Sequence, residues 1–275
     1  MTVGPDAARY WFAASGLPVP RPFHVRRVVP RLLGPNPRRW WIMWAVSWPT
    51  LTAGMVWWRL TAGDPIGLAL VAAALLVALP GILGPAVSIP VQLDLPATAV
   101  TVVGVALFEQ HRPVGTVAAV VVFAVAASMR ETSPIWAALW AWTPIPLVAL
   151  VVPAVIAWCS TPAPVDPLGD KFTDIAKHPV RSAFTAHRGQ WRDAGIMLVP
   201  WGACLAALYG PSWHTVAVVA AAHLVLFAAT DTVRLVHHAA GPWVAVAAAH
   251  TIPARWAPVA VIAGSVTWWR TPVRT

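Results

Sequence analysis

The chain has 275 residues, of which 58% are hydrophobic and 11% charged, with a net charge of +9 and a mean hydropathy of +0.66. This balance excludes an ordinary water-soluble domain, because apolar runs long enough to cross a bilayer recur along the whole sequence. The runs are continuous in Ala, Val and Leu rather than alternating, which favours helices over a barrel. We therefore predict an all-α, polytopic bundle of about eight or nine transmembrane helices in a bacterial plasma membrane.

The first segment, residues 1–39, is predicted to be a basic arm. It carries seven arginines against the single acid Asp6, and its prolines limit any long helix. It shows no apolar core of its own and no signal-peptide pattern, so we expect it to be retained.

Nine apolar runs follow the arm. They lie near Trp40–Trp58, Ile66–Leu83, Leu95–Phe108, Val114–Met129, Ile135–Trp158, Ala194–Tyr209, Thr215–Thr230, Pro242–Ile252 and Pro258–Trp269. Tryptophans gather at the ends of these runs, as at Trp40-Trp41 and Trp57-Trp58, where the headgroup level suits an amphipathic ring. The runs form two predicted membrane blocks, residues 40–158 and 194–275, separated by the polar residues 159–193. The apolar spacing in that separating segment predicts an amphipathic interfacial helix.

The basic residues do not orient the bundle consistently. If the arm is cytoplasmic, simple alternation through the predicted crossings places the five basic residues between Ser160 and Asp193 outside. Either one span is miscounted, with the proline-rich run Ile135–Trp158 as the candidate, or one basic block serves binding rather than topology. The pI of 11.2 does not by itself indicate nucleic acid, because the basic residues adjoin membrane runs and no nucleic-acid-binding motif occurs. Anionic lipid headgroups or a lipid-linked phosphate are the expected partners.

Charged residues near apolar runs are the candidate site. Arg130 and Glu131 lie between two such runs, where they either form a polar site in the bundle or cap a short turn outside it. Asp94 begins the third run and either binds a ligand or favours the helix N-terminus by its charge. Each reading remains open at the level of sequence.

Later in the chain, Asp231, Arg234 and His238 share one face if the segment is helical, which would suit a proton relay or a metal site. The alternative is that His237-His238 occupy a hydrated turn. His250 has no carboxylate beside it in the sequence and is expected to be a packing or interhelical hydrogen-bonding residue.

Three local patterns resemble the polytopic type C (GT-C) glycosyltransferases, which use polyprenyl-phosphate sugars as donors. The first is Asp6-Ala-Ala-Arg-Tyr10 followed by Pro22-Phe-His-Val-Arg26, which is similar to the first external loop of that superfamily. The second is the helix that ends in Met129-Arg-Glu-Thr132, and the third is Asp231-Thr-Val-Arg234. Carried onto this chain, the resemblance implies that the arm is external and that Asp6 is the catalytic base.

The resemblance also implies that Arg26, Arg130 or Arg234 holds the donor phosphate. Glu131 would then orient Arg130 or bind sugar hydroxyls. A carboxylate can take a proton from an acceptor hydroxyl, and a guanidinium can bind phosphate through two parallel hydrogen bonds. The expected donor is a lipid-linked sugar, a divalent metal is compatible but no metal-ligand spacing demands one, and the oligomeric state stays open.

Two other functions are compatible with the same residues. Intramembrane charges and proline-broken helices also occur in small-solute or ion transporters. In a noncatalytic membrane scaffold the charges would only pair helices.

Overall fold

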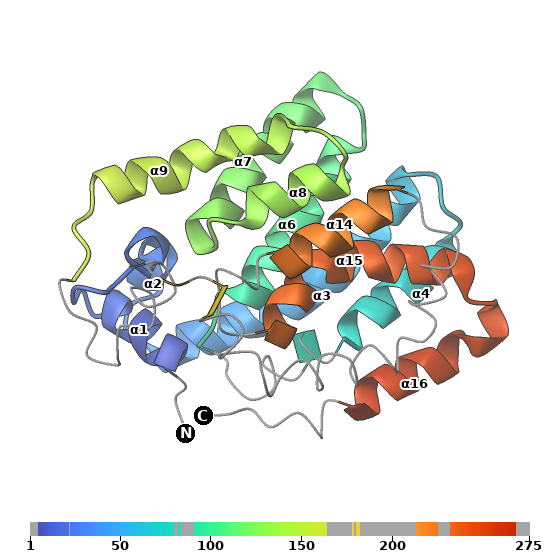
Figure 1. The fold of residues 1–275 in the computed structure, drawn as a ribbon, viewed down its shortest axis with the longest axis horizontal. Coiled ribbons are helices and arrows are strands. Elements are labelled where there is room, and N and C mark those ends of the chain that lie inside the picture. Colours follow the sequence, from blue (N-terminus) through green and yellow to red (C-terminus); the bar gives the residue numbers. More distant parts are fainter. Residues whose placement is uncertain are drawn as a thin grey trace. The chain divides into compact units, whose positions relative to one another are not determined.

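In the computed structural model, the described residues are 5–21, 23–79, 82–83, 91–163, 178, 180–181, 213–224 and 232–267. Every regular element among them is a helix, which confirms the predicted all-α class (Figure 1). None of the described helices combines the length and the apolar character needed to cross a membrane. The predicted run Ala194–Tyr209 lies outside the described residues.

The chain forms two compact units, one from residues 1–54, 86–170 and 274–275 and the other from residues 55–85 and 171–273. The α-helices of the first unit are α1 (Pro5–Ala14), α2 (Val28–Leu33), α3 (Pro37–Thr61, which continues into the second unit), α6 (Asp94–Phe108), α7 (Pro113–Met129), α8 (Ser133–Trp140) and α9 (Val151–Trp158). Two 3₁₀ helices, η1 (Phe23–Arg26) and η2 (Ile145–Leu150), belong to it as well.

Helices α6 and α7 form an antiparallel pair, joined by a short turn, that is central to the first unit. Phe123 of α7 is fully buried against Gly104 of α6, where an added Cβ would lie 2.7 Å from Phe123 Cδ1. Pro113 starts α7 at a position where the missing N–H costs no helical hydrogen bond. The two helices begin within one residue of the predicted runs, because charged or proline residues bound the apolar sequence there.

Replacing Gly104 with Ala is expected to destabilise the α6–α7 pair by about 2 kcal/mol, because the methyl group overpacks the contact with the buried Phe123 ring. Thermal unfolding of the purified protein measures the change. Gly67→Ala is the matched control, because nothing lies within 4 Å of the added Cβ there. Equal melting temperatures for the two variants would contradict the packing.

The arm is helical and buries apolar side chains, contrary to the expectation that it lacks a core. Tyr10 and Phe23 pack in one cluster with Trp40, which begins α3, and Leu93, which precedes α6. Trp40 is fully buried, and its Nε1 donates a hydrogen bond to the Gly34 carbonyl over 3.0 Å. The expectation of an interfacial Trp40 ring is therefore wrong, because the arm folds over it.

The predicted run Ile135–Trp158 is not one helix. It consists of α8, a turn, and the rod made by η2 and α9, and Figure 1 shows the rod running back beside α8. Pro144 and Pro146 fall at the start of η2, and Trp142 in the turn adopts a φ of 51°, in the left-handed region. The prolines remove the amide donors that would continue α8, so the chain reverses direction.

The second unit contains α4 (Ile66–Val77), α14 (Trp213–Leu224), α15 (Thr232–Thr251), the 3₁₀ helix η4 (Ala254–Trp256) and α16 (Ala257–Thr267). Helix α15 packs against α4 and α14. Its Trp243 ring lies over His214, with 3.8 Å between centroids, and donates a hydrogen bond to Thr215 Oγ1 over 3.1 Å. Trp58 also contacts Trp243 and is 1% exposed, so this tryptophan belongs to the core rather than to an interface.

Candidate functional site

The candidate site lies in the first unit, at the end where the arm meets the turn after α7. Its centre is Arg26, the last residue of η1, whose side chain is 11% exposed. The Arg26 guanidinium donates two hydrogen bonds to Glu131, from Nε to Oε2 over 2.6 Å and from Nη2 to Oε1 over 2.5 Å. Its Nη1 donates to the Tyr10 hydroxyl over 3.3 Å. Residues 105 positions apart are thus joined by a fork of parallel hydrogen bonds.

Two arginine side chains of the arm lie against one aromatic ring, that of Phe23. The Phe23 ring has the Arg9 guanidinium 5.1 Å and the Arg26 guanidinium 5.3 Å from its centroid, and Tyr10 meets it edge to face. Both cations lie within the range of favourable cation–π attraction. Arg9 in turn pairs with Asp6, one helical turn away in α1, over 3.2 Å. Asp6 is therefore linked to Arg26 through Arg9 and the Phe23 ring.

A second ion pair lies beside the first. Arg130, the residue after α7, pairs with Asp94, in the first turn of α6. Asp94 is 2% exposed, so it is a buried ion-pair partner in addition to carrying negative charge near the helix N-terminus. Glu131 accepts hydrogen bonds from Arg26, and the charge of the neighbouring Arg130 also acts on its carboxylate.

The ion pair between Arg26 and Glu131 shifts the pKa values of both side chains. Burial alone would raise the pKa of Glu131, but the charge and hydrogen bonds of Arg26, with the nearby charge of Arg130, lower it to about 2. Burial acts to lower the pKa of Arg26, yet Glu131 and Tyr10 raise it well above its ordinary value. Glu131 is therefore ionised at neutral pH and is not poised to donate a proton.

The depressed pKa of Glu131 predicts acid sensitivity. Because the carboxylate is stabilised in the folded state, its contribution is complete above pH 4.5, the ordinary value, and is lost as the pH falls from there to about 2. The loss is expected to reach about 3 kcal/mol. Unfolding free energies measured between pH 7 and pH 2 test this, and a Glu131→Gln variant should lack this part of the pH dependence. An identical acid profile for that variant would contradict it.

One neighbouring histidine was not singled out by its sequence pattern. His24 lies in η1, and its Nδ1 is buried without a hydrogen-bond partner among the described residues. Burial, together with the charges of Arg21 and Arg27, lowers the pKa of His24, so its imidazole is neutral at pH 7. In the sequence, His24 lies between Phe23 and Arg26, and this position could have indicated it. The segment had been chosen only for its arginine.

Other predicted site residues fall elsewhere. Asp231 lies outside the described residues, and Arg234 lies in the first turn of α15 with only its backbone described. His237 and His238 are buried within α15, so the expected hydrated turn is wrong. No group of three or more His, Cys, Asp or Glu that suits a metal occurs in the part of the chain that the structure describes.

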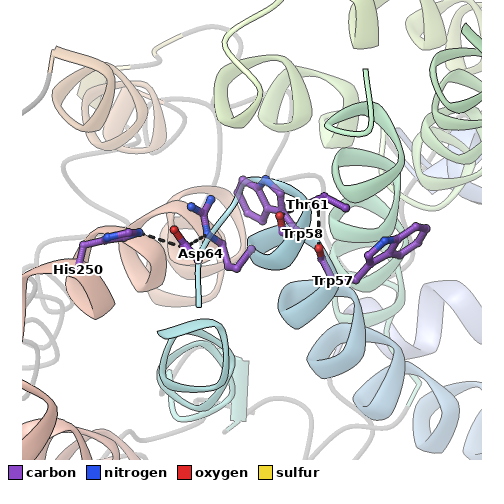
Figure 2. A network of polar contacts seen from close by, with 6 residues as sticks. Trp57, Trp58, Thr61, Asp64 and His250 are labelled. Atoms are coloured by element: carbon purple, nitrogen blue, oxygen red, sulfur yellow. Dashed lines mark hydrogen bonds and ion pairs between the residues drawn. The ribbon is translucent and has the colours of Figure 1, made fainter. Parts of the chain in front are cut away.

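The second unit has its own polar network, in which His250 does meet a carboxylate (Figure 2). Asp64, between α3 and α4, accepts a hydrogen bond from Arg59 Nε over 2.7 Å at Oδ2, and His250 Nε2 lies 3.1 Å from the same oxygen. Burial would raise the pKa of Asp64, but Arg59 and His250 lower it. The partner was not visible in sequence because 186 residues separate it from His250.

Comparison of the chain with protein-family models, with curated proteins and with solved structures finds no match.

Proposed function

We propose that the chain is an integral membrane protein. Helix α7 is 17 residues long, carries no charged side chain, and exposes four valines along one face. These are Val114, Val117, Val121 and Val125, which are between 44% and 81% exposed. Their spacing of three and four residues makes a continuous apolar stripe, which water would not favour and lipid would.

The rod of η2 and α9 supports the same proposal. It exposes Val148, Val151 and Val155, each more than 50% exposed, and ends at Trp158, which is 92% exposed. An indole at the end of an apolar stripe suits the boundary between hydrocarbon and headgroups. Contact with lipid is favourable for both apolar stripes, that of α7 and that of the η2–α9 rod.

Within that membrane protein, we propose a GT-C type glycosyltransferase activity that moves a sugar from a polyprenyl-phosphate donor to an acceptor hydroxyl. The observation that carries this proposal is the convergence of Asp6, Arg26 and Glu131 from opposite ends of the first unit's sequence. Asp6 is 30% exposed and pairs with Arg9 of its own helix, so it is a carboxylate that an acceptor hydroxyl can reach and is suited to act as base. Arg9 lies near the Phe23 ring, as Arg26 does, and is suited to bind the donor phosphate, while Arg26 holds Glu131 in place.

The test is transfer of radiolabelled sugar from a panel of polyprenyl-phosphate sugars by the protein purified in lipid. Replacing Asp6 with Asn is expected to lower turnover by at least about 100-fold, because the acceptor hydroxyl loses its base. Asp64→Asn is the matched control, since Asp64 is also paired with an arginine but belongs to the other unit.

Each outcome of this assay either supports or overturns the proposed transferase activity. Transfer that survives in the control and vanishes in the folded Asp6→Asn protein supports the enzyme and its base. No transfer by the folded wild-type protein with donors and acceptors from its host membranes, or full turnover in Asp6→Asn, would overturn the proposal. Circular dichroism and gel filtration establish that each variant is folded.

A further inference from the structure

We infer that the corner where α2 turns into α3 is a docking surface for anionic phospholipid, with aliphatic side chains in the acyl region and arginines at the phosphate groups. The inference rests on the proposed membrane location, which it deepens by naming a surface that meets the lipid, and it does not depend on the proposed sugar transfer. All residues of this corner surface belong to the first unit. They are Val28, Arg31, Leu32, Arg38, Arg39 and Ile42, and all six are exposed.

Helix α2 divides its apolar side chains between two faces. Val29 and Leu33, four residues apart, pack against the core cluster around Trp40. Val28 and Leu32, also four residues apart, lie on a different face and are 37% and 73% exposed. The first face already attaches α2 to the core, so the exposed pair is not needed for that contact. Exposed aliphatic side chains grouped in this way indicate a surface that meets an apolar partner.

Hydrogen bonds hold the corner in a defined shape. Gly34 adopts a φ of 63°, and its carbonyl accepts a hydrogen bond from Trp40 Nε1 over 3.0 Å. Asn36, which has a proline on each side, accepts a hydrogen bond at Oδ1 from the second amide of α3 over 3.0 Å. Leu32 therefore projects beside a preformed turn, and docking costs little ordering entropy there.

The charges of the corner surface fit an anionic partner. No Asp or Glu occurs between residues 7 and 63, and within the described residues no carboxylate pairs with Arg31, Arg38 or Arg39. Arg38 and Arg39 lie in the first turn of α3, where the helix dipole favours negative charge. Arg39 Nη1 donates to the Leu33 carbonyl over 3.4 Å, and the side chain is otherwise exposed. A layer of phosphate offsets this unfavourable placement of two cations, because guanidinium groups bind phosphate through parallel hydrogen bonds.

A lipid leaflet fits the corner surface better than a nucleic acid does. Nucleic-acid phosphates would meet the arginines but leave Leu32, and Ile42 at 63% exposed, in water. In a leaflet the aliphatic side chains enter the acyl region while the arginine stems lie along it and their charges stay at the phosphates. Trp41, beside Ile42, is 41% exposed, and its indole suits the headgroup level.

Quenching by brominated lipid tests the inference on the full chain. Cys159 and Cys204 are first replaced by Ser, and a bimane dye is then attached at Leu32→Cys. Arg112→Cys, in the charged turn between α6 and α7, carries the same dye as the matched control, and both positions are exposed. The proteins are reconstituted in phosphatidylcholine brominated in its acyl chains, either alone or mixed equally with phosphatidylglycerol. Thermal unfolding establishes that each labelled variant is folded.

In the mixed vesicles, we expect the dye at Leu32→Cys to lose about half of its emission and the dye at Arg112→Cys almost none, because the corner surface reaches the acyl chains. Quenching at Leu32→Cys is expected to fall at least about twofold in phosphatidylcholine alone, where the attraction of the arginines to anionic lipid is absent. The same fall is expected in the mixed vesicles when Arg31→Gln and Arg38→Gln are added.

No quenching at Leu32→Cys, or equal quenching at Arg112→Cys, would overturn the corner surface. Quenching that is the same with and without phosphatidylglycerol would overturn its assignment to anionic lipid. An emission shift at Leu32→Cys with RNA but no quenching by lipid would overturn it in favour of a nucleic acid.

An alkaline carbonate wash of the same vesicles tests the proposed membrane location separately. Protein that stays with the vesicles while Leu32→Cys is unquenched leaves the membrane location standing and overturns the corner surface alone. Protein that the wash releases, although Leu32→Cys was quenched before it, supports the corner surface and overturns the integral location.

Discussion

Replacing Glu131 with Gln is expected to lower the free energy of unfolding by about 3 kcal/mol. The change leaves the Arg26 guanidinium, which is 11% exposed, without the charge that holds it through two hydrogen bonds. A buried cation that loses its counterion costs far more than an exposed one, because the desolvation of the charge is no longer compensated. Thermal or denaturant-induced unfolding of the purified protein measures the loss.

Glu109→Gln is the control for this variant. Glu109 is 21% exposed, and among the described residues its ion-pair partner is the exposed His111 at 3.8 Å, so its loss is expected to cost less than 1 kcal/mol. Adding Arg26→Met to Glu131→Gln should recover part of the stability, since no uncompensated charge is then buried. If the double variant is as unstable as the sum of the single changes, the two side chains are not coupled as the structure has them.

Replacing Arg130 with Met is expected to cost about 3 to 4 kcal/mol, because Asp94 is left 2% exposed without this cation. The pair ties the start of α6 to the end of α7, so the variant should also loosen the end of the bundle that carries the candidate site. Hydrogen exchange of the amides at both helix ends, together with thermal unfolding, measures the two effects.

Arg112→Met provides the matched comparison at the other end of the same helices. Arg112 is exposed, and its replacement is expected to change stability by less than 0.5 kcal/mol. Equal losses in the two variants would show that the Asp94–Arg130 pair contributes nothing particular.

Helices with clear local boundaries could be predicted from the sequence. The predicted helices Leu95–Phe108 and Val114–Met129 correspond to α6 (Asp94–Phe108) and α7 (Pro113–Met129). They could be located because a charged residue or a proline interrupts the apolar pattern at each end. The turn between α8 and the rod of η2 and α9 was missed for the opposite reason. Residues 141–144 of this turn are apolar or small apart from Thr143, so a hydropathy profile shows no break there. Only Pro144 indicates that the helix ends.

The candidate site could be predicted only as a set of residue types. Asp6, Arg26, Glu131, Arg130 and Asp94 were all chosen from sequence, since charge beside an apolar run is expensive and needs a partner. Which carboxylate meets which guanidinium depends on how the arm folds over α3 and α6, and no local pattern encodes that. The burial of Trp40 under the arm was missed for the same reason.

The link between Asp64 and His250 has a consequence for how the protein is made. The second unit is built from residues 55–85 and 171–273, so α4 leaves the ribosome long before the α15 helix that covers it. At typical synthesis rates, the 186 residues between Asp64 and His250 take roughly ten to forty seconds to appear. During that interval Arg59, five positions away, is already available to neutralise Asp64, while the face of α4 that packs against α15 has to be shielded by other parts of the chain or by a chaperone.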